Sequence, residues 1–159
     1  ILDPARLHVK NVLVVLRDSL LTVNSAAARL QRDYRSTSEQ ALIGHARRVA
    51  AACARSARNV APARDAVRNG PLTTRAQQRV QVTLLRMLDS LNTSLTQCEA
   101  DFAAMAQAGN GEEVRDYGNR RLEPVLGLLM RYDHAAIGYF KVYDMDVDPI
   151  GTRPNPLAS

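Results

Sequence analysis

Apolar residues recur at alternating steps of four and three along most of the chain. In the first third the repeat runs through Val9, Leu13, Leu16, Leu20, Val23, Ala27, Leu30 and Tyr34. In the second it runs through Leu42, Ala46, Val49, Cys53, Ser56, Val60, Ala63 and Val67. A spacing of about 3.5 residues keeps these side chains on one face of a helix, and that face must pack against other helices. The pattern therefore predicts an all-α protein.

Start and stop signals divide this pattern into four predicted helices. Asp3-Pro4 combines an acidic N-cap with proline in the first helical turn. Ser36 and Glu39 have the spacing of a capping box, and Asn69-Gly70-Pro71 is typical of a helix end. Gly109-Asn110-Gly111 is a second stop. The predicted helices cover about residues 4–35, 37–68, 73–108 and 112–143.

Two prolines interrupt the predicted helices, because proline removes a backbone donor inside a helix. Pro62 predicts a kink or short break near residues 59–61, and Pro124 predicts a bend in the last helix. Long helices joined by short turns favour an antiparallel up-down-up-down four-helix bundle. We expect this bundle to cover residues 1–143, followed by an extended, proline-rich C-terminal tail over residues 144–159.

Composition bounds the setting of the protein. The 159 residues suffice for one domain with its own core, and the net charge of +5 favours an anionic partner. No apolar run approaches the roughly 18 to 20 residues that a membrane span needs, so we expect no transmembrane segment. The chain begins at Ile1 rather than methionine. We interpret this as a processing site in an exported protein, with a trimmed chain as the alternative.

The two cysteines, Cys53 and Cys98, fall on the predicted core faces of the second and third helices. Two buried free thiols are an ordinary core feature. A disulfide is the sharper hypothesis, although the two positions differ in height along the bundle by roughly 7 Å at 1.5 Å per residue. A disulfide would indicate an oxidising compartment, so we expect a periplasmic or otherwise exported protein peripheral to a membrane.

The sequence offers few residues that could bind a metal or a cofactor in a helical bundle. His8 and His134 lie on the first and last helices, as haem ligands would, but their helical phase is away from the core faces. Asp144, Asp146 and Asp148 begin like a calcium loop, but the required glycine and glutamate are missing further on. We therefore predict no metal and no cofactor, and we keep a bundle haem protein as the lowest-ranked hypothesis.

Two surface features are candidate partner sites. Arg47, Arg48, Arg55 and Arg58 form a basic stripe on the second helix, away from its core face. A solvated helix face is the usual explanation, an anionic lipid or acidic protein surface the next, and nucleic acid ranks last because no aromatic residues interleave. The second feature is an aromatic cluster with the tail. Its candidate residues are Tyr139, Phe140, Tyr143, Asp144, Asp146, Asp148, Pro149, Arg153, Pro154 and Pro156.

The sequence contains no catalytic motif: neither a nucleophile with a nearby base nor a phosphate-binding loop is evident. We therefore expect a non-catalytic accessory subunit that docks on protein subunits of a larger membrane-associated complex. Respiratory or photosynthetic electron-transfer assemblies are hosts to consider, although no residue points to them. The alternative is a ligand-sensing extracytoplasmic bundle of a receptor.

Overall fold

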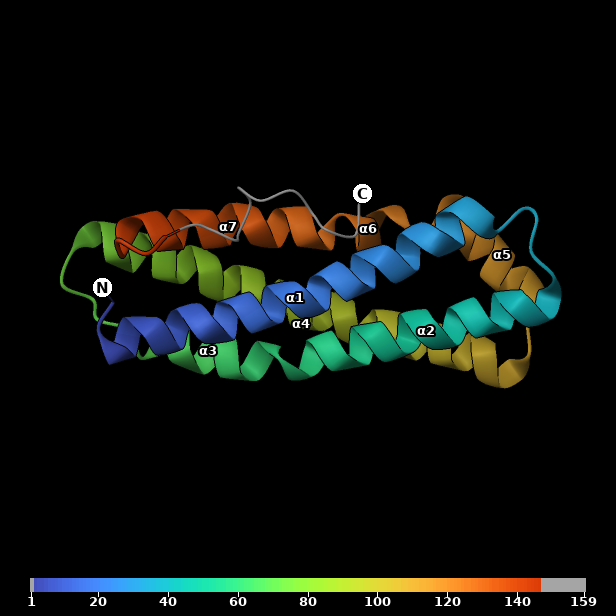
Figure 1. Ribbon diagram of the computed structural model, residues 1–159, viewed down its shortest axis with the longest axis horizontal. Coiled ribbons are helices and arrows are strands. Elements are labelled where there is room, and N and C mark those ends of the chain that lie inside the picture. Colours follow the sequence, from blue (N-terminus) through green and yellow to red (C-terminus); the bar gives the residue numbers. More distant parts are fainter. Residues whose placement is uncertain (1, 147–159) are drawn as a thin grey trace.

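The computed structural model describes residues 2–146, and every regular element in that range is a helix (Figure 1). The prediction of an all-α protein is therefore confirmed. The helices are α1 (Pro4–Asp33), α2 (Glu39–Arg58), α3 (Val60–Arg68), α4 (Arg75–Ala108), α5 (Gly111–Arg120), α6 (Glu123–Leu126) and α7 (Leu128–Val142). Most of the predicted tail, residues 147–159, lies outside the described range.

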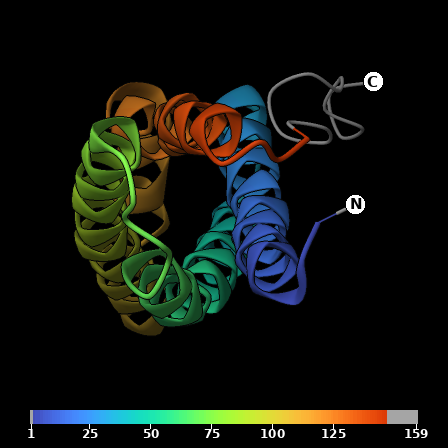
Figure 2. The same ribbon diagram turned by 90° about the vertical axis from the view of Figure 1, so that its left-hand side faces the viewer.

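The long helices lie side by side along one axis (Figure 1). α1 packs against α2 and α3 and also against α6 and α7, while α4 packs against α2, α3 and α7. Seen along the axis, the helices surround a common core (Figure 2). In Figure 1, α3 continues the row that α2 begins, and α7 continues the row of α6.

The break between α2 and α3 falls where the sequence predicts it. α2 ends at Arg58, and Asn59 separates it from α3. The ring of Pro62 would clash with the carbonyl of Arg58 in a continuous helix, and Pro62 has no N–H to donate. The N–H of Asn59 instead bonds to the carbonyl of Ser56 at 3.0 Å, which tightens the last turn of α2.

The fourth predicted helix is interrupted more strongly than expected. In place of one helix bent at Pro124, the chain forms α5, α6 and α7, with breaks at residues 121–122 and at Gly127. Pro124 lies in the first turn of α6, where its missing N–H costs nothing. The N–H of Arg121 still bonds to the carbonyl of Tyr117 at 2.9 Å, so α5 closes its own last turn before the break.

One predicted cap is displaced by two residues. α1 begins as predicted, with the Asp3 side chain accepting the N–H of Arg6 at 2.8 Å. The capping box expected at Ser36 does not form, and Ser38 caps α2 by accepting the N–H of Ala41 at 3.2 Å. Residues 34–36 form a turn instead, and Arg115 of α5 donates to the Tyr34 carbonyl at 2.7 Å.

The core follows the predicted faces. Every residue of the two repeats is buried except Tyr34, which is half-buried. α4 and α7 complete the core with leucines and aromatic residues. The largest fully buried side chains outside the two repeats are Leu84, Leu88, Leu91, Phe102, Tyr132, Tyr139 and Phe140. The helices therefore bury a continuous apolar interior, which is the main stabilising contribution to such a fold.

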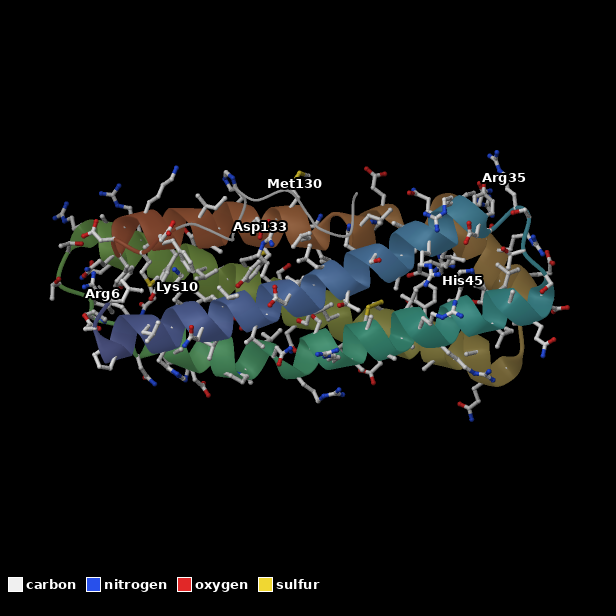
Figure 3. All side chains as sticks on the ribbon, in the orientation of Figure 1. Arg6, Lys10, Arg35, His45, Met130 and Asp133 are labelled. Atoms are coloured by element: carbon white, nitrogen blue, oxygen red, sulfur yellow. A yellow bond between two sulfur atoms is a disulfide. The ribbon has the colours of Figure 1, made fainter. Side chains whose placement is uncertain are left out.

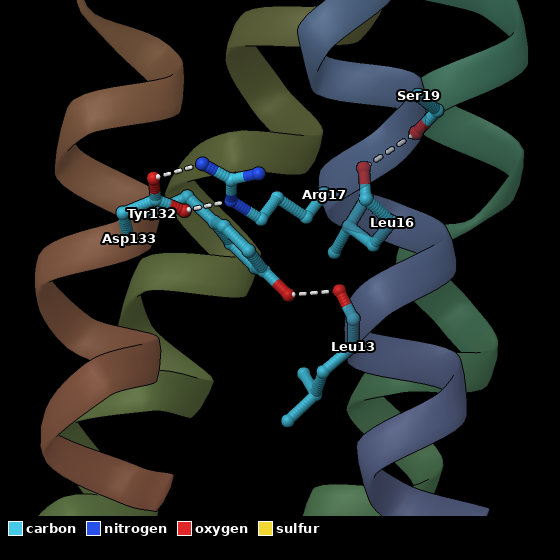
Figure 4. Close-up of polar contacts among 6 residues, drawn as sticks. All are labelled: Leu13, Leu16, Arg17, Ser19, Tyr132 and Asp133. Carbon is cyan, nitrogen blue, oxygen red and sulfur yellow. Dashed lines mark hydrogen bonds and ion pairs between the residues drawn. The ribbon is translucent and has the colours of Figure 1, made fainter. Parts of the chain in front are cut away.

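A polar layer crosses this core between α1 and α7 (Figure 4). The Arg17 guanidinium donates to both carboxylate oxygens of Asp133, at 2.9 and 3.0 Å. The neighbouring Tyr132 hydroxyl donates to the Leu13 carbonyl at 2.6 Å. Arg17 is only 5% exposed and Tyr132 is fully buried, while Asp133 is half-buried, so this satisfied network reaches from the core to its margin. Burial raises the pKa of Tyr132 far above its usual value, which keeps its hydroxyl protonated.

Cys53 of α2 and Cys98 of α4 face each other in the core. Their α-carbons are 6.1 Å apart, and their sulfur atoms lie at disulfide-bonding distance. Both side chains are buried, at 0% and 2% exposure. The height difference estimated from the sequence is therefore absorbed by the packing of α2 against α4, and the geometry is compatible with the predicted disulfide.

Candidate functional site

A groove of about 490 Å³ runs between α1 and α2 on the outside of the molecule. Small residues and three arginines line it. We call it the arginine groove. It is lined by Thr22, Ser25, Ala26 and Arg29 of α1 and by Arg48, Ala51, Ala52 and Arg55 of α2. The groove exists because small residues at the helix contact leave a depression that longer side chains would fill.

The two helices contribute to the arginine groove with the same spacing. The lining positions are 22, 25, 26 and 29 on α1, and 48, 51, 52 and 55 on α2. Residues spaced in this way share one face over two helical turns. Arg48 and Arg55 are thus about 10.5 Å apart along the helix axis at 1.5 Å per residue. The two strips form a trough with two turns of small residues between cationic ends.

The charge of the arginine groove is not neutralised within the described part of the chain. Among the ion pairs there, none includes Arg29, Arg48 or Arg55. The three side chains are exposed, and no acidic residue lines the groove. Guanidinium groups suit carboxylate and phosphate because each offers paired N–H donors in one plane. An anion with carboxylate or phosphate oxygens is therefore the kind of ligand that these side chains are able to bind.

His45 is the titratable residue of α2 that lies within the field of these arginines. It lies on α2, in the half of the molecule near the α1–α2 turn (Figure 3), and is 8% exposed. Burial, followed by the positive field of Arg48, lowers the pKa of His45, with Arg29 and Arg32 acting in the same direction. Asp33 opposes them from 3.9 Å. The imidazole is thus kept neutral by burial and by surrounding arginines.

The predicted basic stripe is divided by the structure. All four of its arginines are exposed, as expected. Arg48 and Arg55 line the arginine groove, whereas Arg47 and Arg58 do not. The sequence analysis did not include Arg29, because it considered a basic stripe on the second helix alone. The signal was present in the matching spacing of residues 22–29 and 48–55.

A second cavity, of about 370 Å³, lies where the start of α1 meets the ends of α3 and α7. We call it the tyrosine-end pocket. It is lined by Ala5, Arg6, His8, Val9, Pro62, Asp65, Ala66, Asn69, Gly70, Pro71, Tyr139, Tyr143 and Met145. The rings of Tyr139 and Tyr143 stack with centroids 4.4 Å apart and form one wall. Its volume is in the range of small-molecule sites.

The hydroxyls of the tyrosine-end pocket are committed to the fold. The Tyr143 hydroxyl donates to the Pro71 carbonyl at 2.6 Å. Burial, and then the Tyr143 hydroxyl, raises the pKa of Tyr139, so this phenol stays protonated near neutral pH. Neither group is available as a phenolate base. The aromatic cluster predicted as a partner anchor is likewise interior: Tyr139, Phe140 and Tyr143 are 1%, 0% and 4% exposed.

The other predicted site residues are dispersed. His8 and His134 are both exposed, on α1 and α7, and so do not face each other across the core. Within residues 2–146, no group of three or more His, Cys, Asp or Glu side chains is placed to hold a metal ion. Asp144 and Asp146 follow α7, with the buried Met145 between them. The remaining predicted tail residues lie outside the described range: Asp148, Pro149, Arg153, Pro154 and Pro156.

Comparison with known proteins adds no relative. No family model, no curated protein and no solved structure matches the chain. None of the helices in residues 2–146 has the length and hydropathy that a bilayer-spanning segment requires.

Proposed function

We propose that the chain is a non-catalytic binding subunit that docks, through the arginine groove, on an anionic surface of a larger membrane-associated complex. The observation that carries this proposal is the set of three exposed arginines without an ion-pair partner in the described chain. Their field attracts anions, and their planar donors can bind carboxylates in pairs. The scaffold would be an antiparallel four-helix bundle whose second and fourth helices are broken.

The proposed setting is an oxidising compartment outside the cytoplasm. The support is the buried Cys53–Cys98 pair at disulfide distance, because such bonds persist in exported proteins. Mass spectrometry of the native protein, alkylated without reductant, tests this setting. Two unmodified cysteines with a mass deficit of two hydrogens are expected, and full alkylation of both would contradict it.

A pull-down from the native membrane fraction in mild detergent tests the docking proposal. The tagged chain is compared with the Arg48→Gln/Arg55→Gln variant and with a matched control, Arg47→Gln/Arg58→Gln. Both variants lose two charges from α2, but only the first changes the arginine groove. A defined complex that is lost with the first variant and kept with the second is expected. Equal recovery with all three proteins would contradict docking through the groove.

A truncated chain, added to the same pull-down, tests the predicted tail contacts. The tail should be removed after Asp146 rather than after Tyr143, because Met145 is buried and its N–H bonds to the Phe140 carbonyl at 2.9 Å. A shorter chain would damage the end of the bundle. Loss of the complex with this truncation would place part of the docking surface in the tail.

The tyrosine-end pocket favours a second candidate function, a ligand-sensing bundle. Its support is a cavity of small-molecule size that combines an aromatic wall with Arg6, His8 and Asp65 at its polar side. An NMR ligand screen that follows the ring protons of Tyr139 and Tyr143 tests it. Saturable shifts of these signals are expected from a true ligand, and unchanged signals across a chemically broad screen would count against this function.

A further inference from the structure

We propose that the occupant of the arginine groove is an acidic amphipathic helix of the partner protein, which rests on the small residues and pairs its carboxylates with Arg48 and Arg55. This inference rests on the proposed function, since it names the partner chemistry of the same site. It follows from the shape of the groove, from the spacing of its arginines and from the absence of exposed large apolar residues among the described residues that line it.

The shape favours a helix. Besides its arginines, the groove is lined by Ala26, Ala51 and Ala52 together with Ser25 and Thr22, over two helical turns. Residues of this size let the backbone of a third helix approach two others closely, and such packing places it along the trough. A helix that binds in a groove does so through its own residues three, four and seven positions apart.

The charges specify the pattern of that helix. Arg48 and Arg55 are separated by two turns, so two carboxylates seven residues apart on a parallel or antiparallel helix meet both. The residues between them, at the third and fourth positions, must be small or aliphatic to contact Ala51 and Ala52. The sequence Arg48-x-x-Ala51-Ala52-x-x-Arg55 is thus complementary to Glu-x-x-Ala-Ala-x-x-Glu. Arg29, on the opposite wall, supplies a third donor group.

A membrane surface fits the groove less well. Peripheral helices that bind lipid insert large apolar side chains into the headgroup boundary beside their basic residues. The exposed large apolar residues of the described chain are Leu7, Val15, Leu72, Val82 and Met130, and none of them lines the arginine groove. A protein helix is therefore the better match.

The test uses a labelled, helix-stabilised peptide with two Glu-x-x-Ala-Ala-x-x-Glu units and an isomer of the same composition in which the glutamates are moved to opposite faces. Binding to the full chain is measured by fluorescence anisotropy at about 50 and about 200 mM salt, because exposed ion pairs are screened. We expect saturable binding of the patterned peptide, at least tenfold weaker binding of the isomer, and weaker binding at higher salt.

Two variants and one control test whether the peptide binds in the groove. Arg48→Gln/Arg55→Gln should weaken binding at least tenfold, while Arg47→Gln/Arg58→Gln should change it by less than threefold. Ala51→Leu keeps every charge but fills the trough, and because Ala51 is exposed the fold tolerates it. It should also weaken binding at least tenfold. Unchanged binding to Ala51→Leu would show contact with the arginines alone and would overturn the helix proposal.

Three further outcomes overturn the inference of a helical partner. They do not decide the docking proposal, which the pull-down tests separately. The first is equal affinity for the patterned peptide and its isomer, which indicates charge without a helical register. The second is groove-dependent binding to vesicles of phosphatidylcholine with phosphatidylserine, or to inorganic phosphate, in the absence of peptide binding. The third is self-association of the chain, seen by sedimentation and abolished by Arg48→Gln/Arg55→Gln, which assigns the groove to a second copy.

Discussion

Two sets of arginines in this molecule have opposite surroundings. Arg17 is buried between α1 and α7, and its Nε and one terminal nitrogen donate to the two carboxylate oxygens of Asp133. Arg29, Arg48 and Arg55 are exposed along the arginine groove and belong to no ion pair in the described chain. The same side chain therefore completes the interior at one place and leaves donors open at another.

The difference teaches where in this molecule to look for function. Burying a charge is costly unless a partner satisfies it, so Arg17 and Asp133 must be kept together for the fold to persist. An exposed arginine carries no such requirement. When three of them border one groove of small residues, they repel each other and add nothing to folding that the structure reveals. The binding proposed above is one use of such a placement, and a solvated helix face is the other.

The largest expected effect comes from breaking the interior pair. Asp133→Ala leaves the Arg17 guanidinium buried without its acceptors and should lower the free energy of unfolding by about 3 kcal/mol. Urea denaturation followed by circular dichroism measures it. The double variant Arg17→Met/Asp133→Leu serves as the control and should recover most of the loss, because apolar side chains of similar size need no partner. A loss below about 1 kcal/mol in the single variant would contradict an interior role for the pair.

A smaller effect is expected from Tyr132, the other member of the interior layer. Tyr132→Phe removes the hydroxyl that donates to the Leu13 carbonyl and leaves that acceptor buried. The cost should be about 1 to 2 kcal/mol of unfolding free energy. Tyr34→Phe is the control, because the Tyr34 hydroxyl makes exposed hydrogen bonds, donating to Asn119 and accepting from Arg35. The control should lose less than Tyr132→Phe, and equal losses would argue against a special role for the buried bond.

The interior was predictable where it is apolar and unpredictable where it is polar. The four-and-three repeat identified most of the buried apolar residues of α1, α2 and α3, because burial imposes a regular spacing on apolar side chains. Arg17 and Asp133 follow no such period. Their pairing depends on the relative height of α1 and α7, and a sequence alone does not give the height of one helix against another. The same holds for Cys53 and Cys98, whose alignment was only estimated.

The candidate site was half predictable for a similar reason. Arg48 and Arg55 could be placed on an outer face from the phase of α2. That they meet Arg29 across small residues depends on which face of α1 adjoins α2 and on the direction of each helix. For the aromatic cluster the sequence allowed either an interface anchor or core packing at one end of the bundle, and the structure buries Tyr139, Phe140 and Tyr143. Their exposure could not be judged before the path of the chain after α7 was known.

His45 lies between the two situations, since it is buried yet close to the groove arginines. Its pKa is lowered below the ordinary value of 6.5, first by burial and then by Arg48. As pH falls, the unfolded chain therefore takes up a proton before the folded chain does. The contribution of neutral His45 to the free energy of unfolding should be fully present above about pH 6.5. It should decrease as the pH falls below that value, and the total decrease should be smaller than the effect of Tyr132→Phe.

Denaturation curves from about pH 7.5 to about pH 5 test this slope. His45→Gln should flatten it, and the exposed His134→Gln should leave it unchanged. An identical slope in His45→Gln would assign the pH dependence to other groups. Arg48→Gln should raise the pKa of His45 in an NMR titration, because the second-largest cause of the lowered value is the field of that arginine.

The smallest effect on stability is expected where the effect on binding is largest. Arg48→Gln/Arg55→Gln removes two exposed charges with no ion-pair partner in the described chain, so its free energy of unfolding should stay within about 0.5 kcal/mol of the unmodified chain. A slight gain is consistent with reduced repulsion around the groove. Denaturation of this variant beside Asp133→Ala, at the same pH and salt, makes the contrast direct. A loss approaching that of Asp133→Ala would mean that the groove arginines also hold the helices together, and their exposure would then no longer argue for a partner.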